Sequence, residues 1–146
     1  PFPKVYFLHG YLNEKEVASL YKHQKVKGLI SLTHGEGFGL PLLEAAACGL
    51  PVCATNWSAH TEFLNLGDWT KVRGRIEPIP ASKVDDNIFV QGAQWANVDI
   101  PMARETIRSF VKEDKPDTKA LQQQLHSRYS FEAISKKYDN FWKRWK

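Results

Sequence analysis

The sequence predicts an α/β fold, built on a parallel sheet with helices on both faces. Over residues 5–55, short apolar runs alternate with helical patterns, and strands joined through helices run parallel to one another. The apolar runs are also nearly continuous, as is typical of strands that are covered on both faces. We therefore expect the order strand, helix, strand, helix, strand in the first part of the chain.

The first elements follow from apolar periodicity and from one capping residue. We expect strands at Val5–His9 and at 28–33. Between them Asn13 is suited to cap a helix that ends at about Gln24. One face of this helix carries three apolar side chains, Val17, Leu20 and Tyr21.

The middle of the chain contains one more clear helix and strand. The helix is expected over 41–48, because the fixed φ of Pro41 suits a first helical turn. A strand over 51–55 follows, and Val72–Pro80 is expected to be extended. Residues 81–98 are expected to form a long loop that contains a solvated pair, Asp85-Asp86. A loop of that length is typical of functional or variable segments.

Three helices are expected in the remainder of the chain. Asp99 is suited to cap the first of them, and the other two are expected over 117–127 and 130–145. The first helix has an apolar face made of Ala103, Ile107, Phe110 and Val111.

The segment 34–44, His-Gly-Glu-Gly-Phe-Gly-Leu-Pro-Leu-Leu-Glu, is the most informative in the chain. Its glycines let the backbone approach a ligand closely, and the N-terminus of the following helix attracts an anion such as phosphate. Glu36 and Glu44 flank this site, so we expect a ligand that carries both phosphates and hydroxyls, such as a nucleotide sugar. We expect Gly39 at the closest approach, so that Gly39→Val blocks binding and leaves the core intact.

Simpler interpretations of this loop exist. Its glycine spacing is neither the G-x-G-x-x-G of dinucleotide-binding proteins nor that of a P-loop. Glu44 could only complement the helix dipole, an effect of about 0.3–1 kcal/mol, and Glu36 could be a solvated loop residue.

Composition indicates an ordinary globular protein, with 42% hydrophobic and 25% charged residues among 146. The sequence shows neither an apolar run of the ~18 residues that a membrane span needs nor a signal peptide. Cys48 and Cys53 are expected to be a buried helix residue and a strand residue, unbridged, which favours a cytoplasmic location. A net charge of +4 without an aromatic–basic motif does not indicate nucleic-acid binding.

The stretch from Glu36 to Glu44, followed by Ala-Ala-Ala-Cys-Gly-Leu-Pro-Val at 45–52, closely resembles the E-x7-E signature of retaining family-4 glycosyltransferases. The resemblance extends over most of the chain through four further segments, 7–12, 16–21, 94–99 (Gln-Trp-Ala-Asn-Val-Asp) and 129–132. It implies one half of a GT-B fold, in which two Rossmann-like domains face a cleft. The signature belongs to the C-terminal, donor-binding domain of those enzymes.

The resemblance also implies roles for individual residues. Glu36 is implied to be the catalytic-site residue that bonds the donor sugar, and Glu44 to accept the ribose hydroxyls. The implied phosphate contacts are the loop residues Gly37, Phe38, Gly39 and Leu40, and the backbone around Tyr11 and Leu12 is implied to meet the base. The resemblance implies that the donor is a nucleoside-diphosphate sugar and that its sugar is transferred with retention, and it implies neither a metal nor another cofactor.

The chain departs from the family pattern at two places. The family's Gly-Gly-x-x-Glu is replaced by Trp57-Ser58-Ala59-His60-Thr61-Glu62, which puts contacts through those glycines in doubt. The family's first strand–helix region, with an Arg and a Lys that grip the diphosphate, has no counterpart here. We therefore expect residues 1–146 to be a partial donor-binding domain whose partner is the missing N-terminal acceptor domain. Alone, this partial domain is expected to bind a nucleotide sugar without catalysing sugar transfer.

The last helix has an apolar stripe, Ile134, Tyr138, Phe141, Trp142 and Trp145, beside several lysines. We expect the stripe to pack on the body of the protein. The alternative is a peripheral contact with an anionic membrane.

Three functions fit the sequence. The first is a hexosyltransferase, which the signature favours. The others are a nucleotide-sugar-binding module without catalysis, and a different GT-B relative such as a phosphorylase or a non-hydrolysing epimerase.

Overall fold

A parallel three-stranded sheet forms the centre of the protein. The computed structural model describes residues 3–112 and 115–145. The strands β1 (Leu29–Ser31), β2 (Val52–Thr55) and β3 (Thr70–Val72) lie in the order β1-β2-β3 and are parallel. All four residues of β2 are buried, which explains the apolar run that predicted it.

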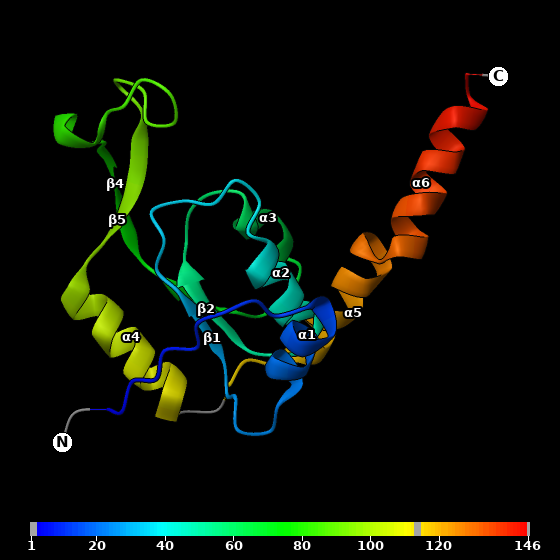
Figure 1. Cartoon of the computed structure of the whole chain (residues 1–146), viewed down its shortest axis with the longest axis horizontal. Helices are drawn as coiled ribbons and strands as arrows, with labels where there is room; N and C mark the ends of the chain where they lie inside the picture. The colour runs from blue at the N-terminus through cyan, green and yellow to red at the C-terminus, as the bar shows by residue number, and fades with distance from the viewer. Residues whose placement is uncertain (1–2, 113–114, 146) are drawn as a thin grey trace.

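Helices cover both faces of this sheet, as predicted (Figure 1). On one face, α2 (Leu40–Ala47), α3 (His60–Leu64) and α5 (Thr118–Tyr129) enclose a core that includes Leu42, Val52, Phe63, Leu64, Leu121 and Leu125. On the other face, α4 (Ile100–Lys112) packs against β3, and Ala103 and Phe110 meet Cys53 and Val72. The first helix, α1 (Glu14–Lys22), lies beside α2.

The predicted caps Asn13 and Asp99 are confirmed, and Asp117 and Ser130 cap the two helices that were expected to begin near them. Asn13, Asp99, Asp117 and Ser130 each accept a backbone N–H from the first turn of the helix that follows. At α1 the cap is reciprocal, because Glu16 accepts the Asn13 N–H at 2.8 Å while its own N–H donates to Asn13. These bonds satisfy N–H groups that a helix leaves without internal partners.

The predicted strand at Val5–His9 is wrong. The segment has no regular secondary structure, and Phe7 is 94% exposed. A strand exists only through hydrogen bonds to a neighbouring strand, and the sheet of the described chain ends at β1 on this side. An apolar run therefore indicated a preference for burial but not the presence of a partner.

The prediction for residues 72–98 is also partly wrong. The expected extended segment is divided between β3 and a separate strand, β4 (Gly74–Pro78). β5 (Gln94–Val98), expected to be loop, pairs antiparallel with β4, so that Gly74 lies opposite Val98. The connection between them contains one turn of 3-10 helix, η1 (Ala81–Lys83). The two strands form a hairpin that projects from the body (Figure 1).

Two expectations of burial are wrong. Val111 is exposed, because it lies at the edge of the α4 stripe whose centre contains Ala103 and Phe110. Cys48 is half-buried at the C-terminal cap of α2, whereas Cys53 is buried in β2 as expected. Burial raises the pKa of the Cys53 thiol to about 11.

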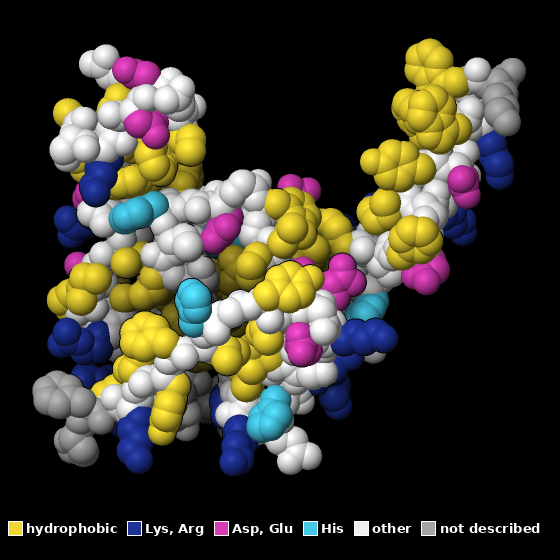
Figure 2. Space-filling model, in the orientation of Figure 1, with side chains coloured by type: hydrophobic (Ala, Val, Ile, Leu, Met, Phe, Trp, Pro, Cys, Tyr) yellow, Lys and Arg dark blue, Asp and Glu magenta, His cyan; other side chains and the backbone are white. Residues whose placement is uncertain are grey.

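The last helix, α6 (Phe131–Lys143), does not pack on the body, contrary to expectation. Ser130 ends α5 and begins α6 in an extended conformation, and α6 extends away as an arm. Figure 2 shows its hydrophobic side chains along one side and lysines and arginine on the other; Trp142 is 61% exposed. Within 3–112 and 115–145, every helix is too short or too polar to cross a membrane.

Candidate functional site

The glycine loop connects the carboxyl end of β1 to the start of α2. Its last residue, Gly39, is the N-terminal cap of α2, with φ 88° and ψ 46°. In this left-handed conformation its carbonyl accepts the N–H groups of Leu42 and Leu43, at 3.0 and 3.1 Å. Only glycine adopts such a backbone without strain, so the local sequence determines where the helix begins.

Gly39 also lies against the core, which changes the expectation for its substitution. A Cβ at this position would be 3.0 Å from the Cβ of His60. His60 cannot easily move, because it is fully buried and its Nε2–H donates to the Thr55 carbonyl at 2.7 Å. Gly39→Val would therefore strain the fold as well as the loop. By contrast, a Cβ on Gly37 would meet nothing within 4 Å.

Ser58 holds the middle of the glycine loop in place. Its hydroxyl accepts the Glu36 N–H at 2.9 Å and donates to the Glu36 carbonyl at 2.7 Å. Ser58 itself has φ 85°, a conformation that favours glycine. Aligned on Glu62, Ser58 occupies the first glycine of the family's Gly-Gly-x-x-Glu. The glycine-like backbone is therefore retained, and a side-chain clamp is added to it.

The carboxylate of Glu36 is half-buried and is also held in place. The Thr33 hydroxyl donates to its Oε1 at 2.9 Å. Glu36 lines an open cavity of about 690 Å³, here called the Glu36 cavity. The side chains that line this cavity include Thr33, His34, Glu36, Trp57, Phe89, Gln94 and Trp95.

The N–H groups at the tip of the loop, those of Phe38, Gly39 and Leu40, have no partner within the described chain. Of the three residues that carry them, Phe38 and Leu40 are exposed whereas Gly39 is buried. The Phe38 ring packs toward Phe63, with 5.5 Å between ring centroids, which anchors this part of the loop. Free N–H groups at the N-terminus of α2 form a site of positive potential that suits an anion.

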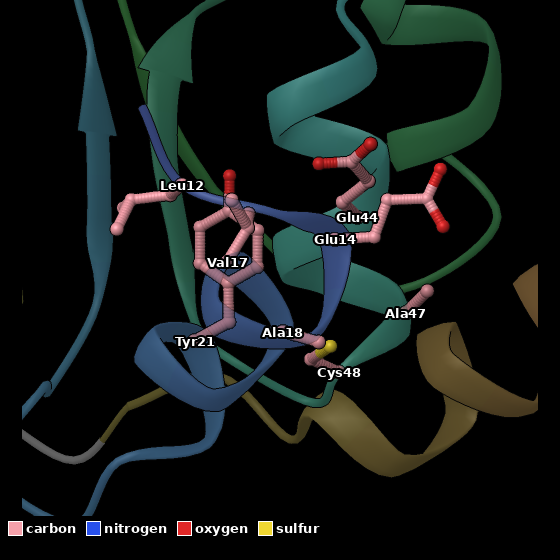
Figure 3. A pocket seen from close by; sticks show the side chains of 8 residues that line it. All are labelled: Leu12, Glu14, Val17, Ala18, Tyr21, Glu44, Ala47 and Cys48. Carbon is pink, nitrogen blue, oxygen red and sulfur yellow. The ribbon is translucent and has the colours of Figure 1, made fainter. Parts of the chain in front are cut away.

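Glu44 lies on the other side of α2, in a pocket of about 420 Å³ between α1 and α2 (Figure 3). This Glu44 pocket is lined by Leu12, Glu14, Val17, Tyr21, Glu44 and Cys48, among others. Figure 3 shows Leu12 and Tyr21 on one wall and Glu44 on the other. The pocket thus combines apolar surface with carboxylates that accept hydrogen bonds.

The pKa of Tyr21 is affected by the charged groups of this pocket. Its pKa is raised from the ordinary value, first by burial, then by the negative charges of Glu44 and Cys48. Like any tyrosine near neutral pH, the phenol is protonated and can donate a hydrogen bond, and the upward shift extends this to more alkaline pH. Sequence reasoning had assigned Tyr21 only to an apolar helix face, because its neighbour Glu44 comes from a different helix.

The predicted site residues are divided by the structure into three groups. Glu36 and Gly37 line the Glu36 cavity, and Leu12 and Glu44 line the Glu44 pocket. The other predicted phosphate contacts, Phe38, Gly39 and Leu40, follow Gly37 at the end of the loop and the start of α2. Tyr11 is 90% exposed and is not among the residues that line either space, and its contact with a base stays a prediction.

Several lining residues were missed from the sequence. Trp57 follows β2, and Phe89 and Trp95 come from the β4–β5 hairpin. The position of Trp57 after a strand at the carboxyl edge of the sheet was a usable signal, since open α/β sheets bind ligands there. Nothing local indicated that the hairpin returns to the glycine loop.

Metal-binding side chains do not gather at this site. Among the residues that the structure describes, no three His, Cys, Asp or Glu side chains lie close enough to hold a metal ion. The free N–H groups and the helix dipole are thus the positive features that the described site offers to an anion.

Comparison with protein families identifies the chain. The model of "Glycosyl transferases group 1" matches residues 3–86, which include α1, the glycine loop and β1 to β4. The chain belongs to this family. The parallel sheet flanked by helices is consistent with one Rossmann-like half of a GT-B glycosyltransferase.

A curated relative is similar over a shorter stretch. The chain is 38% identical over 79 residues to a probable sucrose-phosphate synthase from Thermosipho melanesiensis. This alignment covers 51% of the chain and 19% of the relative, so the chain spans about a fifth of the protein it matches.

Proposed function

We propose that the chain is the donor-binding domain of a retaining glycosyltransferase that takes its sugar from a nucleoside diphosphate without a metal. The observation that carries this proposal is a pair of carboxylate-lined spaces, the Glu36 cavity at the glycine loop and the Glu44 pocket beside α2, with the N-terminus of α2 following the loop. A nucleotide sugar has the same order: a ribose with hydroxyls, a diphosphate, and a second sugar with hydroxyls.

The loop between the two spaces is proposed to bind the diphosphate. The N–H groups of Phe38, Gly39 and Leu40 donate no hydrogen bond within the described chain. We propose that they donate to phosphate oxygens. Negative charge grows on the diphosphate as its bond to the sugar breaks. Fixed donors and a helix N-terminus stabilise that charge most when it is fully developed, which lowers the barrier.

Glu36 is proposed to bind the donor sugar next to the reacting carbon. An ionised carboxylate only accepts hydrogen bonds, and sugar hydroxyls donate them. The hydrogen bonds from Thr33 and Ser58 fix Glu36 before the donor binds. The entropic cost of ordering this side chain on binding is therefore small. Its role is to position the sugar and to stabilise positive charge on the ring.

The Glu44 pocket is proposed to bind the nucleoside. Glu44 would accept the ribose 2′- and 3′-hydroxyls, and the base would lie against Leu12 and the ring of Tyr21. The protonated phenol of Tyr21 would offer a hydrogen-bond donor to a ring nitrogen or carbonyl of the base.

The proposed transfer exchanges one bond at the anomeric carbon for another. An acceptor hydroxyl oxygen forms a bond to the anomeric carbon on the face from which the diphosphate leaves. The bond from that carbon to the diphosphate oxygen breaks, and the hydroxyl proton passes to the departing diphosphate. The relative's name describes the synthesis of sucrose phosphate, which contains a bond between two sugars, and this supports transfer to a sugar acceptor.

The test is a calorimetric titration of the chain with UDP, GDP and ADP, with and without a chelator. We expect one of them to bind equally well in both conditions, because the proposed anion site is made of N–H groups. A strict requirement for magnesium would overturn the metal-free site. Absence of binding for all three would overturn the nucleotide-binding proposal itself.

A further inference from the structure

The β4–β5 hairpin forms a wall of the Glu36 cavity that donor binding does not use. Phe89 and Trp95 belong to the hairpin and face the same space as Glu36 and Trp57. At about 690 Å³ this space is within the range of roughly 300–1,000 Å³ that is usual for small-molecule sites. Figure 1 shows the hairpin beside the end of the sheet from which the glycine loop leaves.

The aromatic rings of this wall are ordered relative to one another. His34 and Trp95 are stacked, with 4.0 Å between ring centroids and 10° between ring planes. Phe89 stands edge-on to Trp95, at 5.8 Å and 79°. Phe89 is 38% exposed and Trp57 is 41% exposed, so both retain aromatic surface that a ligand can cover.

Two sets of hydrogen bonds hold the wall in place. Ala96 of β5 is tied to the loop residue His34 by its N–H, at 2.9 Å, and by its carbonyl, which accepts from Nδ1 of the imidazole at 2.8 Å. Within the hairpin, the Asp85 carboxylate accepts three successive backbone N–H groups, and the last of them belongs to Phe89, at 2.8 Å. These donors lower the pKa of Asp85. The wall is therefore built before a ligand binds.

The polar groups of the cavity point to a neutral ligand with hydroxyls. Thr33, Glu36 and Gln94 provide a hydroxyl, a carboxylate and an amide beside the aromatic surface. Lysine and arginine are absent from its lining in the described chain, so a phosphate would find no cation there. A pyranose ring fits this combination, because it has an apolar face of C–H groups and a rim of hydroxyls.

We infer that the Glu36 cavity binds a neutral pyranose of the acceptor saccharide on the Trp57–Phe89–Trp95 wall, beside the donor sugar at Glu36. This inference rests on the proposed transfer reaction, which requires an acceptor hydroxyl near the carbon that Glu36 faces. Phe89 and Trp95 lie beyond residues 3–86, so these two members of the wall lie outside the segment that the family model matches, whereas Trp57 lies within it.

The five tryptophans of the chain provide a direct test by NMR, because each indole N–H gives its own signal. Trp57 and Trp95 line the cavity, Trp69 is buried in the core, and Trp142 and Trp145 lie on the exposed arm. The probes are maltose, cellobiose and sucrose, with cyclohexanol as an apolar compound that has a single hydroxyl.

At least one saccharide is expected to shift the Trp57 and Trp95 signals in a saturable manner, leaving the other three unchanged. Cyclohexanol is expected to shift none of them at the same concentration. If every saccharide leaves Trp57 and Trp95 unmoved, or if cyclohexanol moves them equally, the inference is overturned. If UDP, GDP or ADP moves them instead, the wall binds a base and the inference is likewise overturned.

A matched pair of variants tests the wall itself. Trp57→Ala is expected to weaken saccharide binding about tenfold, the loss of one aromatic contact. Trp142→Ala removes an indole from the arm and is expected to change nothing. Phe89→Ala is the second cavity variant and is also expected to weaken binding, since it removes exposed surface from a hairpin tip. Equal affinities in all three variants would overturn the inference.

These outcomes are distinguishable from failure of the proposed function. Nucleotide binding is read from the backbone N–H signal of Leu40 and the ring signals of Tyr21, two residues that do not line the Glu36 cavity. If nucleotide shifts these signals and no saccharide binds, only the acceptor site is wrong. If saccharide binds and no nucleotide does, the donor-binding proposal is wrong.

Discussion

The two glutamates on either side of the glycine loop are held in different ways. Glu36 is half-buried, its carboxylate accepts from Thr33, and both of its backbone polar groups are bonded to Ser58. Glu44 is exposed on α2. Its position depends on the buried face of that helix, on which Ala45 and Ala46 pack into the core.

This difference matches the two ends of the proposed donor. The sugar end contains the bond that breaks, and small displacements there cost much of the rate, so a fixed carboxylate is useful. The nucleoside end supplies binding energy, for which an exposed carboxylate is sufficient. Substitutions on the two sides should therefore affect different quantities, and the predictions below test that separation.

The largest effect is expected at Gly37, between the two sides. Gly37→Val adds a side chain where nothing lies within 4 Å, so the free energy of unfolding should change little. If a diphosphate lies against this backbone, the added side chain should abolish nucleotide binding. Calorimetric titration and urea unfolding of the same preparation measure both quantities.

Gly39→Ala is the matched control for Gly37→Val. It should lower the free energy of unfolding by about 1–2 kcal/mol, because alanine is strained at φ 88° and its Cβ meets His60. Unchanged nucleotide affinity in the Gly37 variant would mean that the diphosphate does not approach this loop.

The next effect is expected at Glu44. Glu44→Gln should weaken ribonucleotide binding by roughly 10- to 100-fold, since a hydrogen bond to a charged group contributes about 1.5–3 kcal/mol. Binding of the 2′,3′-dideoxy nucleotide should change much less, because it has no ribose hydroxyls to donate. Equal losses for both ligands would contradict the ribose assignment and leave Glu44 as a partner of the helix dipole.

The Glu44→Gln variant can also be tested without a ligand, through the pKa of Tyr21. The negative charge of Glu44 raises the pKa of Tyr21, so Glu44→Gln should move that pKa down toward its ordinary value. The ring signals of Tyr21, followed by NMR during an alkaline titration, report the shift. Glu105→Gln, an exposed carboxylate on α4, should leave the Tyr21 pKa unchanged.

The smallest effect is expected at Ser58 and concerns stability. Ser58→Ala removes both bonds to Glu36 and keeps a strained φ, and should lower the free energy of unfolding by about 1–3 kcal/mol. Ser58→Gly loses the same bonds but relieves the strain, and should be about 1 kcal/mol more stable than the alanine variant. Urea unfolding of the two variants checks this order, and the reverse order would contradict a strained backbone at Ser58.

The sequence alone determined the elements that depend on short-range signals. The caps Asn13, Asp99, Asp117 and Ser130 act on N–H groups two or three residues away, so their chemistry can be recognised in the sequence. The glycine loop, with Pro41 in the first turn of α2, is equally local. The near-continuous apolar run of β2 indicated a strand covered on both faces.

Only the tertiary structure decided how distant segments meet. β5 was expected to be loop because its partner lies across a long connection, and Val5–His9 was expected to be a strand although no described strand pairs with it. The exposure of α6 likewise depended on the direction in which the chain leaves Ser130.

The candidate site likewise combines features that were recognisable in the sequence with contacts that only the tertiary structure shows. The signature glutamates could be chosen from sequence, but the Ser58 clamp joins residues 22 apart and the bond from His34 to Ala96 joins residues 62 apart. Periodicity and capping act within a few residues, whereas a cavity is formed by side chains that only the packed sheet and its hairpin bring together. The sequence therefore indicated which groups are candidates to bind phosphate and hydroxyls, and the packing decided that Glu36 and Glu44 line two separate spaces.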